Sequence, residues 1–153
     1  KASAKPEKRH TGIEEPEGGD NIYYIDSYGA LAKCVYSSET FEQDYIRGQI
    51  TTDEQLAIDR DRAAQIRFAL EKYAAEHNAE PLDWTDLDRY KYHIIYAYDV
   101  NDLRIRALCF TRHDIVYFDS EQTALDAIKA VGEEDVLWLY RDYQPYLNAF
   151  KMD

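Results

Sequence analysis

Hydrophobic and polar positions alternate most regularly in the stretch RYKYHIIYAYDV, between Arg89 and Val100. Side chains of a strand point alternately to its two faces, so this period of two predicts a strand with one aromatic face. Such a face suits either the stacking of nucleic-acid bases or packing inside the protein. The aromatic row consists of Tyr90, Tyr92, Ile94, Tyr96 and Tyr98.

The next strand decides between these two uses. A turn at Asn101-Asp102 is expected to lead into a strand over residues 103–110, LRIRALCF. The tyrosines then share their face with the most apolar residues of that strand, while Arg104 and Arg106 lie on the other face. We therefore expect a core face covered by a helix, although a turn one residue longer or shorter would reverse the faces. The expected pairs are Tyr98 with Ile105, Tyr96 with Ala107, Ile94 with Cys109, and Tyr92 with Thr111.

The first half of the chain repeats the order of hairpin and helix. Strands are expected at residues 21–25 and 30–36, joined by the turn DSYG. Residues 51–78 carry apolar side chains at helical spacing and predict a long amphipathic helix, after a loop that contains Gly48. Its capping box is formed by Thr52 with Gln55 or, in the alternative register, by Thr51 with Glu54.

The second half continues with a short strand, IVYF, and a helix over residues 120–131. Asp119 or Ser120 is expected to cap this helix, which stops at Gly132. Residues 133–150 predict a short helix that breaks before Pro145.

These elements predict an α+β fold. An antiparallel sheet is built from two hairpin-plus-helix units, and the long amphipathic helix packs on one face of it. Residues 1–20 are expected to form a flexible tail, because they lack aromatics and are rich in Pro, Gly and charge. Residues 21–153 are expected to form a single domain. Whether the two halves arose by duplication stays open.

The net charge of −12 is unevenly distributed. Residues 53–88 hold ten acids and four bases, and residues 114–142 hold eight acids and two bases, so each segment is net −6. Residues 89–113 hold two acids and five bases and are net +3. No apolar run approaches the ~20 residues of a membrane helix, so we expect a soluble, intracellular protein.

Motifs for catalysis and cofactor binding are absent. There is no Walker loop, no GxGxxG and no Gly-x-Ser-x-Gly elbow, and the four histidines are dispersed. The carboxylates of DWTDLD, residues 83–88, lack the spacing of a calcium loop, and loop polarity and capping account for them. We predict no enzyme activity, no metal and no cofactor.

The acidic segments suggest a binding surface. Carboxylates at a spacing comparable to the phosphates of DNA would attract the basic cleft of a nucleic-acid-binding protein. The alternative is that the acidity only maintains solubility. The candidate contact residues are Asp59, Asp61, Glu133, Glu134 and Asp135, with Trp138 and Tyr140 as hot spots.

Two other functions stay open. The cationic hairpin 89–113 could bind nucleic acid through Lys91, Arg104, Arg106 and exposed tyrosines, although the net charge of −12 disfavours direct binding. An unrecognised small enzyme is the remaining alternative.

Four segments together carry a family resemblance: IYYIDSYG, GQITTDEQLA, KYHIIYAYD and IVYFDSEQTALDAIKAVGEED. Over residues 22–135 the chain resembles small, tyrosine-rich phage and prophage proteins of unknown function. It departs from their pattern at Gln49, Ile50 and Leu56. The resemblance implies an accessory protein in the cytoplasm of a bacterial host that binds and blocks a host protein, such as a CRISPR effector. It implies no catalytic residues.

Overall fold

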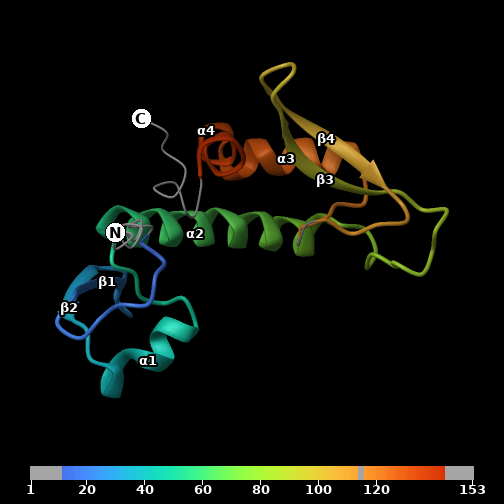
Figure 1. The fold of residues 1–153 in the computed structure, drawn as a ribbon. Coiled ribbons are helices and arrows are strands. Elements are labelled where there is room, and N and C mark those ends of the chain that lie inside the picture. The colour runs from blue at the N-terminus through green and yellow to red at the C-terminus, as the bar shows by residue number, and fades with distance from the viewer. Residues whose placement is uncertain (1–11, 114–115, 144–153) are drawn as a thin grey trace, which may run out of the picture. The chain divides into compact units, whose positions relative to one another are not determined.

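The computed structural model describes residues 12–113 and 116–143 and shows an α+β fold (Figure 1). Contacts group the chain into two compact units. We call residues 12–62 unit 1 and residues 63–143 unit 2. The elements are β1 (Asn21–Ile25), β2 (Leu31–Val35), α1 (Ser38–Ile46), α2 (Glu54–His77), β3 (Lys91–Ala97), β4 (Asp102–Leu108), α3 (Glu121–Val131), α4 (Glu133–Leu137) and a π-helical turn, η1 (Trp138–Asp142).

The first hairpin forms where the sequence predicts it. β1 and β2 are antiparallel, and the Asp26 carboxylate closes their turn by accepting the N–H groups of Tyr28 (2.8 Å) and Ala30 (3.0 Å). Gly29 has φ 79°, a conformation that glycine adopts without the penalty of a Cβ. The turn residues therefore follow directly from local chemistry.

Unit 1 has a small core of its own. Ile22, Tyr36 and Ile50 are buried together, and the side chains of Phe41 and Tyr45 on α1 pack against them. No residue of α1 is fully buried, so the segment lacks the apolar stripe that reveals a helix in a sequence. For this reason α1 lies within a stretch that the sequence predicts as a loop.

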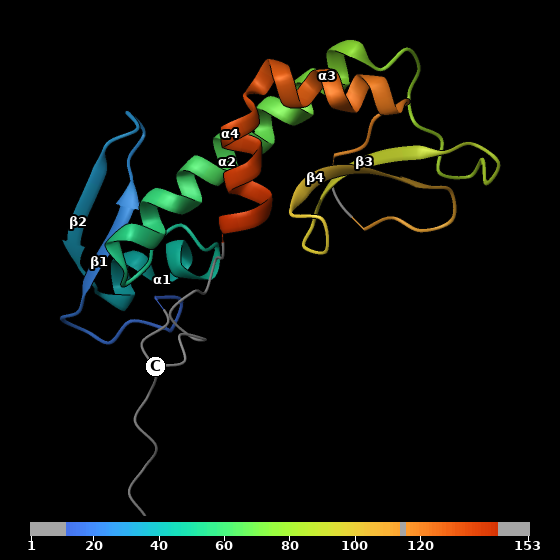
Figure 2. The ribbon, with the colours of Figure 1, turned by 90° about the horizontal axis from the view of Figure 1, so that it is seen from above.

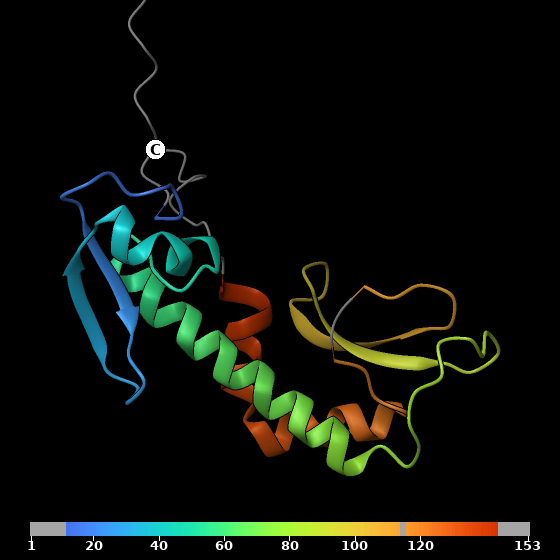
Figure 3. The same cartoon turned by 90° about the horizontal axis from the view of Figure 1, so that it is seen from below.

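The long helix α2 is confirmed, but its cap differs from both predicted registers. Asp53 precedes the helix, and its carboxylate accepts the N–H of Leu56 (2.8 Å). The Thr51 hydroxyl instead donates to the carbonyl of Gly12 and accepts the N–H of Asp53 (3.1 Å). The helix ends at His77 as predicted, and Figure 3 shows it unbroken. Its buried residues are Leu56, Ala57, Ala63, Ile66, Leu70 and Ala74.

Part of the predicted N-terminal tail is in contact with this cap. Gly12 and Pro16 are buried, and a Cβ on Gly12 would lie 2.7 Å from the Cβ of Asp53. Gly12 has φ 81°, so the close approach and the backbone conformation both require glycine. The rest of the predicted tail, residues 1–11, lies outside the described residues.

The second hairpin has the predicted faces but a different register. Tyr96 pairs with Leu103 rather than Ala107, and Ile94 pairs with Ile105 rather than Cys109. The loop spans residues 98–101 instead of a two-residue turn, and longer loops of this kind shift pairing along the partner strand. The shift is an even number of residues, so every side chain keeps its face.

The tyrosine face packs inward only at its middle, so the prediction is confirmed in part: Tyr90 and Tyr98 at its two ends are 53 % and 67 % exposed. Tyr92, Ile94, Leu103 and Ile105 belong to the core of unit 2 or pack against it. The helix α3 contacts both strands of this hairpin, and η1 contacts β3. The expected packing of the long helix on one face of a sheet is not confirmed, although its buried residues in unit 2 join the same core.

The single sheet predicted from two hairpins is wrong for the described residues. β1 pairs with β2 and β3 pairs with β4, which gives two separate two-stranded sheets (Figure 2). Each hairpin gains only an isolated bridge, between Tyr23 and Thr51 in unit 1 and between Tyr92 and Phe118 in unit 2. Hydrophobic pattern alone carries no information on which hairpins share an edge, because both arrangements bury the same faces.

The C-terminal elements largely follow the prediction. Ser120 caps α3 by accepting the N–H of Thr123 (3.1 Å), and the helix ends before Gly132. The predicted strand IVYF reduces to the bridge at Phe118, and its first residue and Pro145 lie outside the described residues. In the described part of the chain no helix has both the length and the apolar character that a membrane crossing requires.

Candidate functional site

The acidic residues predicted to bind a partner fall into two groups in different units. Asp59 and Asp61 are partly exposed on α2, within unit 1. Residues two apart on a helix point about 200° away from each other, so these two carboxylates do not share a face. Asp59 also accepts a hydrogen bond from the amide of Gln55 (2.9 Å). The other group is Glu133, Glu134 and Asp135, in the first turn of α4.

The two aromatic residues predicted as hot spots are partly buried in the packing of unit 2. Trp138 and Tyr140 lie on η1 and pack against the core of unit 2. The ring of Trp138 also contacts that of Tyr143, at 5.4 Å between centroids. Their role in partner binding stays a prediction.

Unit 1 carries a larger net negative charge than either acidic segment predicted from the sequence, spread over more residues. Residues 12–62 hold twelve acids and four bases, net −8, and none of the twelve carboxylate side chains is buried. The acidic segment of residues 53–88 crosses the boundary between the units, so its carboxylates are divided between unit 1 and unit 2. The acids are Glu14, Glu15, Glu17, Asp20, Asp26, Glu39, Glu42, Asp44, Asp53, Glu54, Asp59 and Asp61, and the bases are Lys33, Arg47, Arg60 and Arg62.

The cationic hairpin keeps only part of its predicted contact set. Arg104 and Arg106 are exposed on the face of β4 opposite the core. Lys91 was expected to join them, but its side chain is fully buried and its ammonium donates to the carbonyl of Asp86 (2.5 Å). Lys91 is therefore a structural residue and is not available to a nucleic acid.

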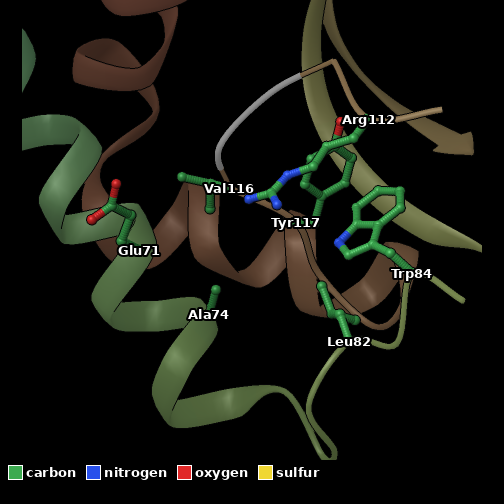
Figure 4. A pocket seen from close by; sticks show the side chains of 7 residues that line it. All are labelled: Glu71, Ala74, Leu82, Trp84, Arg112, Val116 and Tyr117. Carbon is green, nitrogen blue, oxygen red and sulfur yellow. The ribbon is translucent and has the colours of Figure 1, made fainter.

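Unit 2 also contains a pocket that the sequence did not indicate, with a volume of about 370 Å³ (Figure 4). The guanidinium of Arg112 points into the space between Glu71 on α2 and the rings of Trp84 and Tyr117. Three aliphatic side chains complete the wall. The lining residues are Glu71, Ala74, Leu82, Trp84, Arg112, Val116 and Tyr117.

Aromatic and cationic contacts hold the wall of this pocket in place. Trp84 and Tyr117 meet edge to face, with centroids 4.7 Å apart and planes at 82°. The Lys91 ammonium lies 5.2 Å from the centroid of the Trp84 ring, and the Arg112 guanidinium lies 5.7 Å from it. Both cations are within the range of a cation–π interaction. Trp84 is therefore fixed from several sides although it lies in a loop.

The loop that carries Trp84 is ordered by its own polar residues. The carboxylate of Asp83 accepts hydrogen bonds from the hydroxyl (2.6 Å) and the N–H (2.9 Å) of Thr85. These bonds to the charged form lower the pKa of Asp83 below its usual range, and the charge of Lys91 adds to the effect. Asp83 thus acts as a turn-forming residue, and so does Asp86, whose carboxylate accepts the N–H of Asp88 (3.1 Å), in keeping with the loop and capping role that the sequence predicts.

No metal centre is evident in residues 12–113 and 116–143: they contain no group of three or more His, Cys, Asp and Glu side chains that could hold a metal ion. Comparisons of the chain with models of protein families, with curated proteins and with solved structures found no match.

Proposed function

We propose that this chain is a non-enzymatic accessory protein of the phage type that binds and inhibits a host protein with a basic nucleic-acid-binding cleft. The observation that supports the proposal is the charge of unit 1. This unit contains twelve acids and four bases, and none of the twelve carboxylates is buried. A nucleic-acid-handling defence protein, such as a CRISPR effector, has the required cleft, and the acidic surface would occupy it as a mimic of DNA.

Electrostatics explains why such a surface would bind. Duplex DNA presents roughly one charge per 1.7 Å of its axis, and a cleft that attracts it also attracts a dense set of carboxylates. Charges at the edge of an interface mainly accelerate association and are screened by salt. Binding through unit 1 should therefore weaken strongly as the ionic strength rises.

A pull-down from bacterial host extract tests the proposal. The immobilised chain is washed at low and high salt, and a second set of beads is challenged with duplex DNA. We expect a captured protein that is released by about 0.5 M salt, where the Debye length falls to a few Å, and that is displaced by the DNA. A partner that stays bound at full strength in both washes would contradict the mimicry.

Two matched variants locate the surface. The first combines Glu39→Gln, Glu42→Gln and Glu54→Gln, all exposed in unit 1. The second combines three exposed acids of unit 2, Glu121→Gln, Glu133→Gln and Glu134→Gln. Both variants remove the same charge, so a difference between them depends on where the charge was. If the partner binds unit 1, only the first variant should lower the association rate, on the order of tenfold or more. Equal losses in both variants would show that net charge alone is responsible, and a loss only in the second would move the site to α4.

Nucleic-acid binding by the second hairpin is the other candidate, because Arg104 and Arg106 are exposed side by side and Phe110 nearby is 75 % exposed. A gel shift with single- and double-stranded DNA and RNA at low salt tests it. A shift that is lost in Arg104→Gln/Arg106→Gln would support it, and no shift with any of the nucleic acids would eliminate it.

A further inference from the structure

Two opposite charges line the pocket of unit 2 without pairing with each other. Among the described residues, neither Glu71 nor Arg112 has an ion pair, and both side chains are exposed to the pocket and solvent. The Arg112 guanidinium lies over the ring of Trp84, 5.7 Å from its centroid. Elsewhere in the same unit, arginine and glutamate do form a pair, as Arg89 and Glu80 do at 3.2 Å. Within the described part of the chain, the pocket thus presents a donor group and an acceptor group that are not paired with each other.

The shape and lining of the pocket suit a small planar ligand. Its volume of about 370 Å³ falls within the range of small-molecule sites, roughly 300–1,000 Å³. Of its apolar lining, Trp84 and Leu82 are half-buried and Val116 and Tyr117 are buried, so the half-buried indole of Trp84 is the main surface for the face of a flat ring. The polar groups are few and convergent, which is how small-molecule sites fix the orientation of a ligand.

The two charged groups select among planar ligands. A guanidinium donates two parallel hydrogen bonds to an acceptor pair, and the O6 and N7 atoms of guanine are such a pair. On the adjacent edge guanine carries the N1–H and N2–H donors that a carboxylate accepts. Adenine has an acceptor at N1 in place of that donor, so it would repel Glu71. The set of Arg112, Glu71 and Trp84 therefore complements guanine better than adenine.

From these observations we propose that the pocket of unit 2 binds a guanine mononucleotide. On binding, Arg112 leaves the ring of Trp84 and donates to O6 and N7, the ring then provides the stacking surface, and Glu71 accepts from N1–H and N2–H. A free mononucleotide fits better than a strand of nucleic acid, because a chain of net charge −12 repels polyphosphate. The residues of this site all belong to unit 2, so the proposal does not depend on the proposed function of unit 1.

Tryptophan fluorescence tests the site directly. The chain has two tryptophans, so Trp138→Phe leaves Trp84 as the sole reporter. GMP, AMP and ribose 5-phosphate are titrated up to about 10 mM, which covers dissociation constants in the millimolar range and below. Free N-acetyltryptophanamide is titrated in parallel to correct for purine absorbance. Saturable quenching by GMP, weaker binding of AMP by on the order of tenfold, and no effect of ribose 5-phosphate are expected.

Three substitutions assign the contacts. Arg112→Gln should weaken GMP on the order of tenfold, because a bidentate contact is lost. Glu71→Gln should reduce the preference for GMP over AMP. Arg89→Gln is the matched control, since Arg89 lies in the neighbouring loop but does not line the pocket, and it should leave GMP binding unchanged. Circular dichroism of each variant checks that it is folded.

Several results would overturn the proposal. These are the absence of saturable quenching by GMP, equal affinity for AMP, and unchanged binding by a folded Arg112→Gln variant. A single-stranded DNA tetramer containing one guanine is included as a second source of the same base. Tighter binding of the tetramer than of GMP would overturn the assignment to a mononucleotide. Calorimetry of GMP with the unsubstituted chain gives an answer even if a variant fails to fold.

Discussion

Lysine is rarely buried without a partner, yet the side chain of Lys91 has no exposed surface. Its ammonium donates to the carbonyl of Asp86 and lies over the ring of Trp84. The alternating pattern of the strand assigns Lys91 to the face opposite the tyrosines, where a charged side chain is expected in solvent. The loop that folds over this face buries it, and only the tertiary structure contains that contact.

Replacing Lys91 with methionine should destabilise the protein. The Lys91→Met variant keeps the aliphatic stem but loses the charge-assisted hydrogen bond and the cation–π contact, and part of that loss is offset because no charge needs to be desolvated. We expect a decrease in the free energy of unfolding of about 1–2 kcal/mol, measured by urea denaturation.

Lys33→Met is the matched control. Lys33 also lies over a ring, that of Tyr23 at 5.9 Å, but its side chain is exposed. Its loss should change the free energy of unfolding by no more than about 0.5 kcal/mol. Equal stability of the Lys91→Met variant and the unsubstituted chain would show that the buried ammonium contributes nothing net.

At the scale of elements, the two capped helices repeat one local arrangement. The side chains of Asp53 and Ser120 each accept the N–H of the residue three positions later. Two residues before each cap lies a residue that forms a bridge to the first strand of a hairpin: Thr51 before Asp53, and Phe118 before Ser120. The sequence DEQLAID, which starts at the cap of α2, corresponds position by position to SEQTALD, which starts at the cap of α3. In both, the glutamine amide donates to the aspartate four residues on, at 2.9 and 2.8 Å. The shared order of the two halves thus extends to their hydrogen bonds.

The cap of α3 should carry a measurable share of stability. Ser120→Ala removes the acceptor for the N–H of Thr123, and we expect a loss of about 1 kcal/mol in the free energy of unfolding. Ser37→Ala is the matched control, because Ser37 stands before α1 but makes no side-chain capping bond, and its loss should be near zero. Chemical denaturation of the two variants compares them. Equal losses would mean that the side-chain cap is not responsible.

At the scale of the whole molecule, charge is the dominant feature. The net charge is −12, and several of the ion pairs in the described residues are long and exposed, such as Lys72 with Glu76 at 3.8 Å and Arg104 with Asp102 at 4.0 Å. Exposed pairs of this kind contribute little, so repulsion between carboxylates should outweigh attraction. The proposed use of unit 1 as a binding surface gives a reason for keeping this repulsion.

Salt should therefore stabilise the protein on its own. Raising NaCl from about 20 mM to about 200 mM shortens the Debye length and screens the repulsion, so we expect the melting temperature to rise by roughly 2–4 °C. The variant with Glu39, Glu42 and Glu54 changed to glutamine should show a smaller rise, because unit 1 then carries less charge. Differential scanning calorimetry measures both. A melting temperature that falls with salt would show that attractive pairs dominate.

Local chemistry is enough to predict much of this chain. The turn at Asp26 and Gly29, the cap at Ser120 and the stop at Gly132 depend on residues within a few positions of one another. The face of each side chain in β3 and β4 was also predictable, because it depends only on alternation and an even shift. The register of this hairpin was not predictable, because it depends on the length of the loop. The helix α1 was not predictable either, because it has no buried residues and therefore no periodic apolar pattern.

The pocket could not be predicted from the sequence, because its residues come from separate segments of the chain. Glu71 lies on α2, Trp84 in the loop before β3, and Arg112 and Tyr117 after β4. Each alone has an ordinary explanation as a helix surface, loop or strand-end residue. Packing around the buried core of unit 2 brings these residues to one wall of the pocket. The pocket therefore depends on contacts between distant segments of the chain, which no local sequence pattern encodes.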